Sequence, residues 1–217
     1  MPTKRKVGNL LALAVLGTLV QRPMHPYEMA STLRARGKDD DMPIKWGSLY
    51  TVVQNLEKHR FVTAIGSVRQ GGRPERTVYQ ITEAGRAELK DWVRDLVARP
   101  EHEPTKFKAA LSVLGALTPD EAIELLRQRV DQLEQRIARH RATLAADLAQ
   151  IPRLFLVEEE YDLAMRQAQL DWVTALLDEL GSGSFPDLAG WREFHREGTV
   201  PPGFAELSER GQEKDQN

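Results

Sequence analysis

A short cationic loop between two β-branched stretches is the feature that most limits the folds open to this chain of 217 residues. Residues 61–68 and 76–81 both have the alternation and composition of strands. The segment between them, Arg-Gln-Gly-Gly-Arg-Pro-Glu at 69–75, combines two glycines, a proline and two arginines. Two short strands around such a loop predict a β-hairpin within a chain whose other patterns are helical.

Helical segments lie on both sides of this hairpin. Three precede it, at residues 7–21, 27–36 and 47–59, and a fourth is capped by Thr82 and reaches about residue 98. The order helix, helix, helix, strand, strand, helix is that of a winged helix-turn-helix. We therefore assign residues 1–98 to a winged helix-turn-helix DNA-binding domain.

The first of these helices lies in the longest uncharged run of the chain, residues 7–21. A membrane span needs roughly 18 apolar residues, so this run is too short for one. Basic residues precede it as they would in a signal peptide, but no small-residue cleavage site follows. We expect a buried helix in a cytoplasmic protein that does not enter a membrane.

The second half of the chain has long helical patterns. A helical stretch is expected at residues 105–117. The sequence Thr-Pro-Asp-Glu at 118–121 is a typical helix start, with a capping threonine, a proline in the first turn and an acidic residue that can reach back to the cap. It predicts a helix that runs to about residue 150. Another helix is expected at about 158–180.

The expected fold class is mainly α with a small β-hairpin. An N-terminal winged helix-turn-helix precedes a C-terminal, coiled-coil-like dimerisation domain at residues 104–181. Beyond Gly181, prolines and glycines mixed with polar residues predict an extended or partly disordered tail at 182–217.

Charge separates the two halves. Residues 1–90 carry a net charge of +7 and residues 91–217 a net charge of −9. This asymmetry indicates that only the first half meets a polyanion. The chain has no cysteine, which excludes a disulfide framework and cysteine-ligated zinc.

On a helical wheel, the segment at 47–59 has one apolar face and one polar face. Small, hydrogen-bonding and cationic side chains on the polar face suit a major groove, and an arginine-bearing loop suits phosphates and the minor groove. The alternative for each residue is an ordinary solvated surface. The predicted DNA contacts are Lys4, Arg5, Lys45, Ser48, Tyr50, Thr51, Gln54, Asn55, Lys58, Arg69, Arg73 and Arg76.

Four motifs resemble those of the PadR family of transcriptional regulators: His-Pro-Tyr-Glu-Met at 25–29, Gly-Ser-Leu-Tyr at 47–50, Gly-Arg-Pro-Glu-Arg at 72–76 and Tyr-Gln-Ile-Thr-Glu-Ala-Gly at 79–85. The resemblance covers about residues 8–98. It implies a homodimeric winged-helix repressor, in which residues 48–58 enter the major groove and residues 69–76 form the wing. Ser48 stands where threonine is usual in the family, and Pro26 where glycine is usual.

The two long C-terminal helices have apolar faces that predict helix pairing. The seam of the helix after Thr118 is narrow, and packing within the chain is as good an interpretation of it as a partner interface. The last long helix is apolar on two sides, as expected for a helix held between two neighbours. The predicted dimerisation residues are Leu126, Val130, Leu133, Ile137, Leu144, Tyr161, Met165, Trp172 and Leu176.

Three tryptophans, Trp46, Trp92 and Trp172, are candidates for binding a small aromatic effector, although each is also a normal core residue. The resemblance supports the effector, because some relatives bind aromatic compounds between their two parts. His140, at the edge of the apolar seam, is interpreted as an interface histidine or, alternatively, as a switch.

No pattern in the sequence indicates an enzyme. A P-loop, a dinucleotide fingerprint, a nucleophile elbow and a zinc-binding histidine pair are all missing, and the five histidines are scattered. We expect no cofactor and no metal. The predicted function is a homodimeric, ligand-responsive repressor that binds a two-fold operator in double-stranded DNA. The alternative is a coiled-coil scaffold protein without sequence-specific DNA binding.

Overall fold

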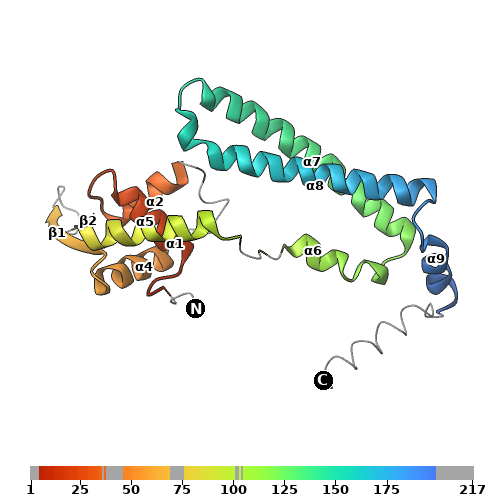
Figure 1. Ribbon diagram of the computed structural model, residues 1–217, viewed down its shortest axis with the longest axis horizontal. Coiled ribbons are helices and arrows are strands. Elements are labelled where there is room, and N and C mark those ends of the chain that lie inside the picture. The colour runs from red at the N-terminus through yellow and green to blue at the C-terminus, as the bar shows by residue number, and fades with distance from the viewer. Residues whose placement is uncertain are drawn as a thin grey trace, which may run out of the picture. The chain divides into compact units, whose positions relative to one another are not determined.

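The computed structural model describes residues 5–35, 37, 46–68, 76–100, 103 and 105–198 (Figure 1). The chain divides into two compact units, one before and one after the boundary between residues 103 and 104. No helix among the described residues is long and apolar enough to cross a membrane.

The first unit is a small helical domain with a two-stranded hairpin. Its elements follow the order expected for a winged helix-turn-helix. They are α1 (Leu10–Leu19), α2 (Pro26–Ala35), α4 (Trp46–Lys58), β1 (Val62–Val68), β2 (Arg76–Ile81) and α5 (Glu83–Ala98).

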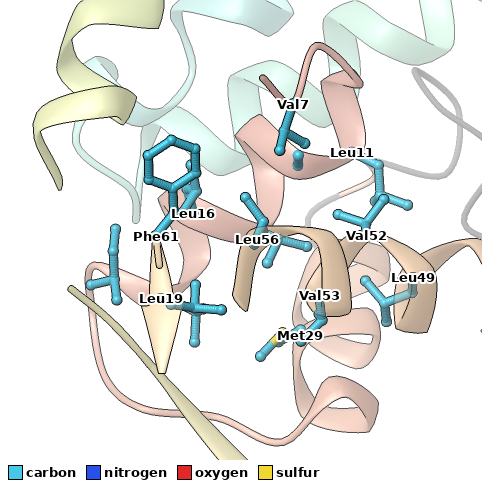
Figure 2. Close-up of a cluster of buried hydrophobic side chains, with 14 of the residues drawn as sticks. Val7, Leu11, Leu16, Leu19, Met29, Leu49, Val52, Val53, Leu56 and Phe61 are labelled. Carbon is cyan, nitrogen blue, oxygen red and sulfur yellow. The ribbon is translucent and has the colours of Figure 1, made fainter. Parts of the chain in front are cut away.

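The core of the first unit gathers apolar side chains from α1, α2, α4 and the start of β1 (Figure 2). Helix α1 is buried on several sides, as its uncharged sequence predicts. Burial of each leucine or valine contributes about 1.5–3 kcal/mol. Because α4 places Leu49, Val53 and Leu56 in this core, its orientation on the unit is fixed.

The start of α2 explains why His25, Pro26 and Glu28 occur together. The carboxylate of Glu28 accepts the backbone N–H of His25 at 3.0 Å, and His25 Nδ1 accepts the N–H of Tyr27 at 3.0 Å. Proline fits the first helical position because it has no N–H to leave unpaired. These three residues therefore cap the helix, and the same contacts fix the turn that precedes it.

Helix α4 ends in a Schellman turn that leads directly into β1. The N–H of Phe61 donates to the carbonyl of Leu56, and that of Arg60 to the carbonyl of Glu57. Arg60 occupies the left-handed position of this turn, with φ of 61°, where glycine is usual.

The hairpin pairs β1 with β2 in antiparallel register, from Val62 opposite Ile81 to Val68 opposite Arg76. A bulge between Ala64 and Gly66 shifts the register by one residue. On the other side of β2, Tyr79 forms a bridge with Met24, which joins the hairpin to the loop between α1 and α2.

The second unit contains an antiparallel pair of long helices, α7 (Pro119–Leu148) and α8 (Val157–Ser182), which lie side by side (Figure 1). Helix α6 (Lys106–Leu111) and a short 3-10 turn, η1 (Leu114–Ala116), precede them, where one continuous helix was expected. A second 3-10 turn, η2 (Arg153–Phe155), connects them. Thr118 caps α7 as predicted, with its hydroxyl accepting the N–H of Glu121.

The expectation of an extended or partly disordered tail is wrong for residues 188–197, which form helix α9 (Leu188–Glu197). This helix packs Leu188 and Trp191 on the apolar cluster of the second unit. Trp191 Nε1 donates to the carbonyl of Leu117 at 2.9 Å, and His195 Nε2 to that of Gly115 at 3.0 Å. These contacts join α9 to the turn that leads into α7.

Candidate nucleic-acid interface

The polar face of α4 is open to solvent. Leu49, Val52, Val53 and Leu56 are buried beneath it, as the helical wheel predicts. The side chains predicted to contact DNA from this helix, Ser48, Tyr50, Thr51, Gln54, Asn55 and Lys58, are all exposed.

The chemistry of this face suits base edges and phosphates. Among the described residues, the side chains of Gln54 and Asn55 have no hydrogen-bond partner within the protein, so both amides can offer a donor and an acceptor. The Thr51 hydroxyl donates to the carbonyl of Gly47 at 2.9 Å, which leaves its oxygen and methyl group to face outward. Lys58 adds a positive charge at the end of the same face.

The start of α2 contacts the start of α4 through an aromatic pair. The ring of Tyr50 meets that of His25 edge to face, with centroids 6.4 Å apart. The two helices of the helix-turn-helix are therefore linked at the exposed surface as well as through the core. The sequence predicts a DNA contact for Tyr50, and it indicates no role for His25 beyond its place in the family motif.

Arg5 has partners inside the protein. Its guanidinium forms ion pairs with Glu88 at 2.9 Å and with Asp91 and Asp95 at 3.2 Å, and it lies 5.5 Å from the ring centre of Trp92. The side chain is 16% exposed. These contacts hold the Arg5 side chain against α5, so we leave Arg5 out of the proposed DNA surface.

Several predicted contacts lie outside the described residues. Lys4, Lys45, Arg69 and Arg73 belong to this group, as do the side chains of Trp46 and Arg76. The roles assigned to them remain predictions from the sequence.

The residues predicted for dimerisation fall into two groups. Leu126, Leu133, Ile137 and Leu144 are buried within a single chain, and Val130 and Leu176 are partly buried against its apolar cluster. The seam of α7 is thus already covered within one chain. Tyr161, Met165 and Trp172 on α8 are exposed, with 66% of Tyr161 and 51% of Trp172 accessible to solvent.

The candidate effector tryptophans also differ. Trp92 is 4% exposed and belongs to the core of the first unit. Trp172 is exposed on α8 and meets the Phe107 ring edge to face, with centroids 6.3 Å apart. Of these two tryptophans, Trp172 is the one that is open to solvent.

His140, on α7, directs its imidazole toward acidic residues of α8. Its Nε2 is 3.0 Å from a carboxylate oxygen of Glu159, and its Nδ1 is 3.6 Å from one of Asp162. Arg166 forms an ion pair with Asp162 beside it. Within the described ranges, no group of three or more histidine, aspartate or glutamate side chains is arranged to hold a metal ion.

Comparisons with known proteins agree with this geometry. Residues 15–91 match the model of the transcriptional regulator PadR-like family. The chain is 26% identical over 131 residues to the negative transcriptional regulator PadR of Bacillus subtilis, an alignment that covers 60% of this chain and 69% of that protein. It is 28% identical over 116 residues to a probable transcriptional regulator of Mycobacterium tuberculosis, covering 52% of this chain and 56% of that protein.

Solved structures show the same fold. The structure of Bacillus subtilis PadR in complex with operator DNA matches with a TM-score of 0.68 at 19% identity, over 79% of this chain and 99% of that one. The complex of the same protein with p-coumaric acid matches with a TM-score of 0.66 at 18% identity, over 80% of this chain and 99% of that one. These likenesses show the fold. Residues 15–91, which include the motifs around α2, α4 and α5, are similar to the PadR-like family of transcriptional regulators.

Proposed function

We propose that this regulator is a DNA-binding repressor that reads base edges with the exposed polar face of α4. The observation that supports this proposal is the exposure of Thr51, Gln54 and Lys58 above a firmly buried apolar face. A major groove admits one helix, and amide side chains can pair with base edges there. Arg69, Arg73 and Arg76 of the hairpin loop would add phosphate contacts.

The proposed repressor acts as a homodimer through the exposed apolar side chains of α8. Tyr161, Met165 and Trp172 lie on one side of this helix, and α7 covers another. A two-fold dimer would present two copies of α4 to half-sites about 34 Å apart, one turn of DNA. The protein would work in the cytoplasm, without catalysis.

An effector would act by binding one dimer arrangement more tightly than the other. The complex of the Bacillus subtilis relative with p-coumaric acid supports a small aromatic effector here. Trp172 is the described residue that best supports such a ligand, because its ring is exposed next to Phe107.

Footprinting on the DNA upstream of the chain's own gene tests the proposal. We expect two protected half-sites and an affinity that falls steeply with salt, because phosphate contacts release counterions. Arg73→Ala should weaken binding to all sequences alike, and the salt slope should fall by about one for each phosphate that the arginine no longer neutralises. Absent or salt-insensitive binding would favour the scaffold alternative.

A further inference from the structure

Residues 106–118 lie, along the chain, between the end of the first unit and the long helix α7. They contain α6, η1 and the turn into α7, and we call this segment the elbow. Among these described residues, none in α6 or η1 is fully buried, and Val113 between them is 65% exposed. A segment with so little buried surface has low local stability, so its position depends on the contacts that other elements make with it.

The first part of the elbow is held by a ring of α6. Phe107 packs on the apolar cluster of the second unit, and the guanidinium of Arg129 on α7 stacks on its ring, with 3.6 Å from the central carbon to the ring centre. The Phe107 ring also meets that of Trp172 edge to face. These contacts fix α6 on the helix pair, but they do not involve η1 or the turn that follows it.

Helix α9 holds the second part of the elbow. Trp191 Nε1 donates to the carbonyl of Leu117 at 2.9 Å, and His195 Nε2 donates to the carbonyl of Gly115 at 3.0 Å. The two donors are four residues apart and therefore lie on the same face of α9. One helix near the end of the chain thus supplies two side-chain donors to neighbouring carbonyls of the elbow.

Helix α9 can hold the elbow because it is itself anchored where α7 begins and α8 ends (Figure 1). Leu188 is 4% exposed and belongs to an apolar cluster whose other buried members come from α7 and α8. Trp191 packs on the same cluster, beside the ring of Phe185. Arg192 adds an ion pair, at 3.6 Å, with Asp120 in the first turn of α7. The donors of α9 therefore reach the elbow from a fixed base.

We propose that α9 is a strap that holds the elbow in the arrangement that binds the operator, with Trp191 and His195 as positioning residues for DNA binding. The two side chains act through η1 and do not touch DNA. The inference rests on the proposed repressor function, and it adds a determinant of affinity outside α4 and the hairpin loop. A regulator with a loose elbow occupies its binding-competent arrangement for a smaller fraction of the time, and its apparent affinity falls by that fraction.

Trp191→Phe and His195→Phe, combined in the full chain, test the strap. Both changes keep an aromatic ring and remove the N–H donor, so the packing of α9 should survive. In hydrogen exchange, the amides of residues 112–118 should exchange at least about tenfold faster, because two hydrogen bonds that oppose local opening are lost. The amides in the middle of α8 should keep their exchange rates.

The same double variant should bind the DNA upstream of its own gene at least about fivefold more weakly. The salt slope should stay unchanged because no phosphate contact is removed, and sedimentation equilibrium should give an unchanged dimer dissociation constant. Glu193→Gln is the matched control on α9, since the Glu193 side chain is 59% exposed and pairs with Arg196 at 3.8 Å. This control should alter neither the exchange of the elbow nor the affinity for DNA.

Faster exchange of the elbow with unchanged DNA affinity would overturn the proposal, because α9 would then only stabilise the second unit. Weaker DNA binding without faster exchange of the elbow would overturn it too, as would a lower salt slope or weaker dimerisation. Should the double variant fail to fold, Trp191→Phe alone is judged by the same measurements. Failure of the proposed function has a different signature, because the unaltered chain would then not bind the upstream DNA, and this inference would fall with it.

Discussion

A methyl group on Gly85 would lie 2.0 Å from the carbonyl oxygen of Phe61. The first turn of α5 approaches the backbone this closely because Thr82 ties the two segments together. Its N–H donates to the Phe61 carbonyl, and its hydroxyl accepts the N–H of Gly85. The motif around Thr82 and Gly85 therefore fixes α5 against the junction of α4 and β1.

Gly85→Ala should lower the free energy of unfolding by at least about 2 kcal/mol, because the clash is with backbone and cannot be relieved by a rotamer change. Urea denaturation measures it. Gly17→Ala in α1 is the matched control, since its methyl group would meet nothing within 4 Å and should stabilise the helix by about 0.5–1 kcal/mol. Equal effects of the two changes would contradict the close approach.

Arg60→Gly should stabilise the first unit by about 1 kcal/mol, because the left-handed backbone at Arg60 is strained for any residue with a Cβ atom. Arg60→Ala separates backbone from side chain, as it removes the guanidinium without relieving the strain. Thermal unfolding of the two variants should differ by several degrees. A stability of Arg60→Ala equal to that of Arg60→Gly would show that the turn is not strained.

Stability should depend on pH through Glu28. The N–H of His25 donates to its carboxylate, and together with nearby Arg22 this lowers the pKa of Glu28 below its usual value. A depressed pKa contributes stability at neutral pH that is lost as the pH falls through about 4 and below. The advantage of the native chain over Glu28→Gln should therefore shrink between pH 6 and pH 3. An advantage that is constant over this range would contradict this role of the Glu28 carboxylate.

A charge on the exposed face of α8 should dissociate the proposed dimer. Met165→Glu should raise the dimer dissociation constant at least tenfold in sedimentation equilibrium, because a carboxylate would be buried without a partner. The control is Thr174→Glu, because Thr174 is exposed on the side of α8 away from Trp172. This change should have little effect on the dimer dissociation constant. Dissociation by the control alone would place the interface on the other side of the helix.

The sequence was sufficient to predict the helices and strands of the first unit, because the patterns that define each element involve residues close together in the chain. The apolar spacing of Leu49, Val53 and Leu56 defines the buried face of α4, and Thr82 marks the start of α5. Arg5 is different, since only the folded chain brings it to Glu88, Asp91 and Asp95 on a distant helix. Its basic neighbours in sequence gave no sign of that pairing.

In the second unit, local sequence patterns could not predict which surfaces pack against each other. The seam of α7 has the same spacing whether its partner is α8 or a second chain, so only coordinates could assign Leu133 and Ile137 to packing within the chain. Helix α9 was missed because prolines and glycines flank it. Its apolar residues recur at helical spacing, but its key hydrogen bonds, from Trp191 and His195, are made with residues more than 70 positions away.

The most direct test of DNA reading by α4 is the specificity of Gln54→Ala. Fluorescence anisotropy would compare its affinity for the upstream operator and for single-base variants of each half-site, with Gln135→Ala on α7 as the control. We predict that Gln54→Ala loses about 1–3 kcal/mol of discrimination at one or two positions per half-site, while the control keeps it. Unchanged discrimination at every position in Gln54→Ala would contradict the orientation proposed for α4 on DNA.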